Sequence, residues 1–227
     1  MSDIYPVDPG FAAQARITRE AYANDYDASV NDAETFWLGL SKRLDWFKAP
    51  TRAKDVSYDL KDFHIRWFAD GELNASVNCL DRHLDTHGDK VALIFEPDSP
   101  DTPTQRITYR ELHARVCKLA NALRSLGVAK GDRVTLYLPM IPDAVVAMLA
   151  CARIGAIHMV VFGGFAPNSI ANRVADCGSK LIITADEGLR GGKKVPLKAN
   201  VDAALKLPGT NSVETVLVVR HTGGAVD

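Results

Sequence analysis

Apolar and polar positions alternate in blocks through the second half of the chain, and these blocks predict strands and helices in turn. Short apolar runs at 133–138, 157–162 and 181–184 have the length and the β-branched content of buried strands. The segments between them, 142–154 and 167–177, have helical spacing, with proline at each start and glycine directly after each end. Strands that alternate with helices form a parallel sheet with helices on both faces. We therefore predict an α/β fold with a mostly parallel sheet.

The pattern before this block predicts a hairpin followed by a long amphipathic helix. Residues 90–95 read as a short apolar strand and residues 105–108 as its return strand, with prolines in the loop between them. Thr108 and Glu111 have the spacing of a capping box, which marks a helix start. Leucine and valine then repeat at helical spacing until Gly127, which is expected to end the helix.

The first seventy residues show helical patterns and extended connectors but no sheet pattern. A helix is predicted over 11–22, and Asn31 with Glu34 resembles a capping box for a second helix. Several aromatic residues are expected to pack in a core: Trp46, Phe47, Phe63, Trp67 and Phe68. We therefore predict a helical N-terminal segment, residues 1–70, that packs on a main α/β body, residues 71–227.

Composition and charge narrow the class of protein. Apolar residues make up 47% and charged residues 24%, as in soluble globular proteins, and the formal net charge of -1 gives no electrostatic case for nucleic acid. The longest apolar run, 144–152, is too short to cross a bilayer, and the N-terminus has no signal-peptide pattern. We expect a cytoplasmic protein with neither a nucleic-acid nor a membrane partner.

Metal sites and disulfides are not signalled. A helix predicted over 73–85 leads up to His83 and His87, but Leu84 stands where a zinc protease motif needs glutamate. The four cysteines form no CxxC pair. They are Cys79, Cys117, Cys151 and Cys177. We therefore assign no metal ligand.

A candidate binding site follows from the ends of the predicted strands. Ligands of open parallel sheets bind outside the carboxyl ends of the strands. The pair Gly163-Gly164 follows one strand, and a loop with Arg190, Lys193 and Lys194 follows another. Glycines let a ligand approach the backbone, and the cations favour an anion such as phosphate. The alternative, a simple turn beside a solvated basic surface, is not excluded by spacing alone.

Long segments of the chain resemble the adenylate-forming acyl-CoA synthetase family. Residues 67–84, WFADGELNASVNCLDRHL, are similar to its N-terminal signature, and residues 130–165 are similar almost throughout. Residues 183–198, ITADEGLRGGKKVPLK, are most typical of the acetate-specific branch. The resemblance covers most of the chain and implies a partial N-terminal domain of an adenylate-forming enzyme.

The resemblance implies that acetate is joined to CoA in two steps. Acetate attacks the α-phosphate of ATP, with Mg²⁺ accompanying the ATP, and the CoA thiol then attacks the acetyl-adenylate and releases AMP. Two matching segments help hold the nucleotide end of CoA in the family. They correspond here to Phe162, Gly163 and Gly164, and to Arg190, Gly191, Gly192 and Lys193.

Departures from the family pattern set limits on this expectation. Lys193 stands where a second arginine is common and lacks the two-pronged geometry, and Ala166 stands where serine is common and provides no hydroxyl cap. The ATP and Mg²⁺ sites and the catalytic lysine of the family are expected beyond residue 227. No catalytic residue is therefore assigned, and the chain is expected to be inactive without the remainder of its own domain.

Three alternatives remain open from the sequence. The parent enzyme could use propionate in place of acetate. The chain could instead be a non-catalytic module of the same fold that binds CoA or another nucleotide. It could also be a scaffold whose basic loop binds nothing.

Overall fold

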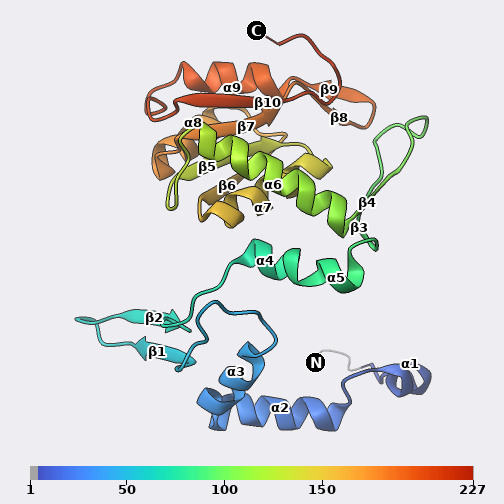
Figure 1. Ribbon diagram of the computed structural model, residues 1–227, viewed down its shortest axis with the longest axis vertical. Coiled ribbons are helices and arrows are strands. Elements are labelled where there is room, and N and C mark those ends of the chain that lie inside the picture. The colour runs from blue at the N-terminus through green and yellow to red at the C-terminus, as the bar shows by residue number, and fades with distance from the viewer. Residues whose placement is uncertain (1–4, 227) are drawn as a thin grey trace. The chain divides into compact units, whose positions relative to one another are not determined.

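The computed structural model describes residues 5–226 and divides the chain into two compact units (Figure 1). The first unit ends at Leu73 and the second begins at Asn74. The elements described in the first unit are α1 (Pro9–Gln14), α2 (Arg19–Asn31), α3 (Ala33–Ser41), β1 (Lys54–Ser57) and β2 (His64–Trp67).

The helix predicted over 11–22 is two helices in the structure. The chain leaves the first helix after Gln14, and Thr18 is the N-cap of the second. The Oγ1 of Thr18 accepts a hydrogen bond from the N–H of Ala21 at 3.1 Å. The prediction was wrong because this cap starts a new helix inside the predicted one.

The capping box predicted from Asn31 and Glu34 was also wrong. Asn31 is the last residue of α2, and the next helix has no side-chain cap among the described residues. The Glu34 carboxylate instead accepts a hydrogen bond from the N–H of Ala53 at 2.7 Å. A partner 19 residues away along the chain has therefore replaced the local one.

The connectors after α3 contain a hairpin that the pattern did not predict. Strands β1 and β2 pair antiparallel, with Lys54 opposite Trp67. The expected aromatic core is wrong for three side chains, since Phe47 is 71%, Phe63 62% and Trp67 47% exposed. Rings pack on one another locally instead, as where Trp37 meets Trp67 edge to face with 5.7 Å between centroids.

The second unit begins with short helical segments in place of the single helix predicted over 73–85. They are α4 (Ala75–Cys79), the 3-10 turn η1 (Asp81–His83) and α5 (Leu84–His87). Leu80 breaks the helix with φ -124° and ψ -64°, and its side chain is 1% exposed. The break places the Leu80 side chain in the core, and the burial of this apolar side chain outweighs the loss of a continuous helix.

The predicted hairpin and amphipathic helix are confirmed. Strands β3 (Val91–Phe95) and β4 (Gln105–Thr108) pair antiparallel and lead directly into α6 (Tyr109–Ser125). The Thr108 Oγ1 accepts from the N–H of Glu111 at 3.2 Å, and the Glu111 carboxylate accepts from the N–H of Thr108 at 2.8 Å. This capping box is formed within four residues, which is why the sequence alone could predict it.

A parallel sheet with strand order β10, β7, β5, β6 forms the centre of the second unit (Figure 1). The α/β class and the parallel sheet are therefore confirmed, and the predicted bounds of β5, α7, β6 and α8 agree with the structure. The elements are β5 (Arg133–Leu138), α7 (Pro142–Ile154), β6 (Ile157–Phe162), α8 (Pro167–Cys177), β7 (Leu181–Ala185), β8 (Gly188–Arg190), β9 (Lys193–Val195), α9 (Leu197–Leu205) and β10 (Thr215–Val219).

Helices cover both faces of this sheet. The connection from β5 to β6 runs one way along the sheet, and the connection from β6 to β7 runs back past β5. Because parallel crossovers are right-handed, α7 and α8 lie on opposite faces. Helix α6 packs with α7, and α9 packs with α8. Strand β7 is buried along its whole length and β5 along nearly all of it, as a doubly covered sheet requires.

Candidate functional site

A cavity of about 330 Å³ lies at the carboxyl edge of the parallel sheet. Strands β5 and β6 both end there, and the hairpin of β8 and β9 closes one side. Since α7 and α8 leave these two neighbouring strands toward opposite faces, the edge between them is the open crevice typical of ligand sites in such sheets. The lining residues are Leu138, Pro139, Met140, Phe162, Gly163, Gly164, Gly188, Leu189, Arg190 and Val195.

The structure brings four of the seven predicted binding residues together at this cavity. They are Phe162, Gly163, Gly164 and Arg190. The other three form the turn and strand start of the adjacent hairpin and are not among the described residues that line the cavity. They are Gly191, Gly192 and Lys193. The two predicted segments are therefore neighbours in space, although only part of each faces the cavity.

Gly163 allows the ends of β5 and β6 to approach each other. A Cβ at this position would lie 3.0 Å from the carbonyl oxygen of Leu138, which is backbone and cannot swing away. The buried Tyr137 hydroxyl holds the same turn from below, donating to the carbonyl of Phe165 at 2.8 Å and accepting from the Asn200 amide at 3.2 Å. The backbone of the glycine turn therefore lies close to the end of β5. A buried hydroxyl that both donates and accepts a hydrogen bond holds the turn in place.

Two phenylalanine rings contact each other beside the cavity, and each has a guanidinium group over it. The Arg190 guanidinium lies 5.5 Å from the ring centroid of Phe162, and the Arg173 guanidinium lies 5.0 Å from that of Phe165. The two rings meet edge to face at 5.8 Å. Phe162 remains 50% exposed and Phe165 38% exposed. Exposed rings beside a guanidinium suit a ligand with a flat aromatic part and an anionic part.

The acidic residues nearest to Arg190 in sequence are engaged elsewhere. Glu187 pairs with the Lys194 ammonium at 2.8 Å and accepts a hydrogen bond from the Thr222 hydroxyl at 2.6 Å. Asp186 accepts hydrogen bonds from the backbone N–H groups of residues 187, 221 and 223. Among the described residues no ion pair joins Arg190 to either acid, so its guanidinium retains donors for an anionic ligand.

The Gly191-Gly192 turn is held by a residue that sequence analysis missed. Both glycines have positive φ, 57° and 73°, as a two-residue hairpin loop requires. Their N–H groups donate to the two carboxylate oxygens of Asp98, each at 2.8 Å, and the bonds from Gly192 and then Gly191 lower the pKa of Asp98. Asp98 lies in the loop between β3 and β4, more than 90 residues away along the chain. No local pattern could have indicated this contact.

Asp186 fixes the backbone beyond β10. Its side chain is 4% exposed and accepts N–H groups from Glu187 at 2.7 Å, His221 at 2.9 Å and Gly223 at 2.8 Å. Burial alone would raise its pKa, but these backbone donors, together with that of Thr222, lower it to about 2. The carboxylate therefore stays charged and anchors the loop that borders a second cavity, of about 560 Å³. Pro139, which lines both cavities, marks where they adjoin.

The described part of the chain contains neither a cluster of metal-binding side chains nor a membrane-spanning helix. Between residues 5 and 226 no group of three or more His, Cys, Asp or Glu side chains could hold a metal ion. None of the helices described there combines the length and the apolarity needed to cross a bilayer.

Family profiles match nearly the whole chain in two consecutive segments. Residues 80–225 match the family described as AMP-binding enzyme. Residues 22–79 match the family described as acetyl-coenzyme A synthetase N-terminus. The candidate cavity lies entirely within the first match.

Individual relatives are similar along the full chain but are much longer. The chain is 76% identical over 227 residues to acetyl-coenzyme A synthetase from Xanthomonas campestris pv. campestris and 71% identical to the protein of that name from Xylella fastidiosa. It spans 35% of the length of each. Acetoacetyl-CoA synthetase from Streptomyces lividans is similar in structure, with a TM-score of 0.83 and 28% identity over 97% of this chain and 35% of that one.

Proposed function

Since the chain belongs to the family of AMP-binding enzymes, we propose that it is the N-terminal part of an acetate–CoA ligase that makes acetyl-CoA from acetate, ATP and CoA. One observation carries this proposal, namely that proteins named acetyl-coenzyme A synthetase match it from end to end at up to 76% identity. The segment matching their N-terminus at 22–79 supports the same assignment. Four free cysteines, all in the second unit, favour a reducing, cytoplasmic setting.

The proposed reaction has two half-reactions. An acetate oxygen attacks the α-phosphorus of ATP, so that a phosphoanhydride bond breaks and pyrophosphate leaves. The CoA thiol then loses its proton and attacks the acetyl carbon, which forms the thioester and releases AMP. Since the chain spans 35% of the length of its relatives, we place the Mg²⁺ and ATP sites in the remainder of the parent enzyme and assign no catalytic residue to this chain.

We assign the cavity at the carboxyl edge to the nucleotide end of CoA. The half-exposed ring of Phe162 suits stacking of an adenine ring, and the Arg190 guanidinium over it suits a phosphate. Gly163 and Gly164 allow the ligand to approach the backbone. Lys193 is exposed on the neighbouring strand and adds a positive charge without the fork of an arginine. Gly191 and Gly192 act indirectly, by setting the turn between these two cations.

Arg190→Ala in the full-length enzyme tests this assignment. A charge-assisted hydrogen bond is worth about 1.5–3 kcal/mol, so the variant should use CoA roughly ten- to a hundredfold less efficiently. Acetate-dependent pyrophosphate exchange into ATP involves no CoA and should remain nearly unchanged. Lys193→Ala should show the same pattern with a smaller effect. Arg115→Ala, which removes an exposed cation from α6, is the control and should alter neither assay.

The two assays distinguish an incorrect CoA-site assignment from an incorrect assignment of the overall reaction. Equal losses in both half-reactions would assign Arg190 a structural role, and no loss in either would favour the scaffold alternative. Absence of acetate-dependent exchange in the unmodified full-length enzyme would instead reject the acetate–CoA ligase proposal. Faster exchange with propionate than with acetate would assign the acyl group differently and leave the CoA site intact.

A further inference from the structure

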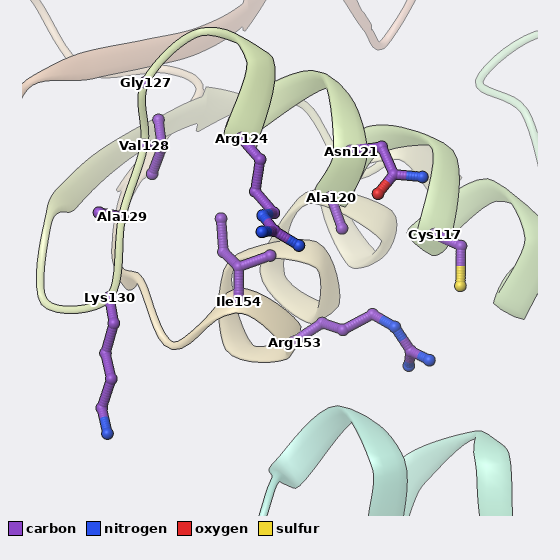
Figure 2. Close-up of a pocket in the computed structure, with 10 residues that line it drawn as sticks. All are labelled: Cys117, Ala120, Asn121, Arg124, Gly127, Val128, Ala129, Lys130, Arg153 and Ile154. Carbon is purple, nitrogen blue, oxygen red and sulfur yellow. The ribbon is translucent and has the colours of Figure 1, made fainter.

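A second cleft, of about 690 Å³, lies at the other end of β5 from the candidate CoA cavity (Figure 2). It is formed by the C-terminal half of α6, the loop at 127–130 that leads into β5, and the last turn of α7. Figure 2 shows Cys117 on the α6 side of this cleft and the long side chain of Arg153 running past it. The proposed acetate–CoA ligase reaction gives this cleft no role.

Cys117 has a neighbouring base and a charge network behind it. Its Sγ lies 3.5 Å from Nε2 of His113, one turn earlier on α6. The same ring nitrogen lies 3.3 Å from the Asp81 carboxylate and 3.3 Å from the Arg153 guanidinium. Arg153 in turn donates two hydrogen bonds to Asp81, at 2.7 and 2.8 Å, which lower the pKa of that carboxyl. The four side chains come from α6, α7 and η1, so the fold assembles them.

This arrangement allows a thiolate to form without a net change of charge. When the Cys117 proton moves to His113, the thiolate is balanced by the imidazolium, and Asp81 is already balanced by Arg153. A thiol beside histidine and arginine is the environment in which cysteine becomes nucleophilic. Cys117 is half-buried and lines the cleft, so a small reagent that enters the cleft reaches it.

The charged side chains that line the cleft are all cationic. Three cationic side chains line it and none of its lining residues is acidic. The cations are Arg124, Lys130 and Arg153, of which Arg153 is already paired with Asp81. Arg124 projects over Ile154 at the centre of the view in Figure 2, and both Arg124 and Lys130 are exposed. A cleft lined by one sign of charge raises the local concentration of ligands of the opposite sign.

We propose that Cys117 is a site of reversible thiol–disulfide exchange with acidic low-molecular-weight disulfides. The Cys117 thiolate, formed by proton transfer to His113, attacks one sulfur of the reagent. A new sulfur–sulfur bond forms as the bond within the reagent breaks, and the departing thiolate takes up the proton from His113. Cys117 is oxidised to a mixed disulfide and half of the reagent is reduced to a thiol, so atoms and electrons balance. The proposal is independent of the acetate–CoA ligase assignment.

Two of the other cysteines provide internal controls. Cys151 is fully buried, and burial raises the pKa of its thiol to about 12, so it should not react in the folded protein. Cys79 is exposed but lies outside the cationic cleft. A comparison between Cys117 and Cys79 therefore separates activation by the cluster from accessibility alone.

The experiment treats the full-length protein with oxidised glutathione and measures the adduct at each cysteine over time by peptide mass spectrometry. We expect Cys117 to react about tenfold faster than Cys79, because its thiolate is activated and the reagent is acidic. With cystamine, a dicationic disulfide, this advantage should shrink to about threefold or less, because the cleft repels the reagent. A Cys117 rate no higher than that of Cys79 with oxidised glutathione would overturn the proposal.

Two matched variants test the role of the cleft. Arg124→Gln should slow the reaction of Cys117 with oxidised glutathione about three- to tenfold and leave the reaction with cystamine no slower. Lys118→Gln removes the same charge from an α6 residue that does not line the cleft and should change neither rate. His113→Gln should slow both reagents. Equal effects of Arg124→Gln and Lys118→Gln would reject the cleft as the source of selectivity, and this comparison holds even if His113→Gln folds poorly.

Discussion

Individual residues in this chain stabilise the backbone at the carboxyl edge of the sheet, and Asp186 gives the clearest pH dependence. Its carboxylate is almost fully buried and is surrounded by backbone N–H groups that lower its pKa from 3.8 to about 2. A carboxyl with a lowered folded-state pKa contributes stability above its unfolded pKa and loses that contribution as the pH falls through its folded pKa. The contribution is therefore fully present at neutral pH and disappears between about pH 4 and pH 2.

Asp186→Asn should lower the free energy of unfolding by about 2 kcal/mol at pH 7, since each unit of pKa shift corresponds to about 1.4 kcal/mol. The difference from the unmodified protein should narrow progressively below about pH 4, where the native carboxylate also begins to be protonated. Urea unfolding of the full-length protein at several pH values measures this. Glu214→Gln, at an exposed acid, is the control and should stay within about 0.5 kcal/mol at every pH. A pH-independent difference for Asp186→Asn would contradict the assigned cause.

Gly163→Ala tests the close approach of β5 and β6. The added Cβ would lie 3.0 Å from a backbone oxygen, so the strand ends must shift, which costs about 1–3 kcal/mol. We expect a lower melting temperature and weaker use of CoA, with pyrophosphate exchange less affected. Gly39→Ala is the matched control, because Gly39 lies inside α3 with nothing within 4 Å of the added atom. That variant should be neutral or slightly stabilising. Equal melting temperatures for the two variants would contradict the packing argument.

At the scale of helices and strands, some elements follow from residues close together in the sequence, and others depend on contacts between residues far apart in the sequence. Helices α7 and α8 begin and end where the sequence predicts, because proline lies at each start and a left-handed glycine at each end. The hairpin of β8 and β9 was predicted only as a loop. Its turn is held by Asp98, a residue from a different hairpin, and such a contact leaves no trace in the local pattern.

Asp98→Ala should therefore act on the hairpin as a unit. Without the two carboxylate hydrogen bonds, the turn between Arg190 and Lys193 should loosen and the KM for CoA should rise about three- to tenfold, as expected for about 1 kcal/mol. The rate of pyrophosphate exchange should not change. Asp101→Ala, in the same loop but without a described contact to the turn, is the control. An unchanged KM for CoA in Asp98→Ala would show that the turn does not position the cations.

At the scale of the whole molecule, the outer strands of the sheet are β6 and β10, and each has one edge that no strand between residues 5 and 226 pairs with. Strand β6 also exposes large apolar side chains, with Ile157 55% and Val160 58% exposed. Unpaired strand edges and exposed apolar side chains both promote association. We therefore expect the 227-residue chain, expressed by itself, to bind a hydrophobic dye or to aggregate. Dye fluorescence and light scattering measure this. A sharp two-state melt without dye binding would instead indicate an autonomous domain.

The sequence by itself determined the α/β class and the alternation of strands and helices in a parallel sheet, and it predicted where the candidate site would lie. These features depend on apolar periodicity and on caps formed within four residues, and both are visible along the chain. Only the tertiary structure decided that Asp98 holds the Gly191-Gly192 turn and that Arg190 lies against Phe162. It also decided that Cys117 lies among His113, Asp81 and Arg153. Such contacts join residues from separate elements, and they exist only once packing of the sheet and helices has brought those elements together.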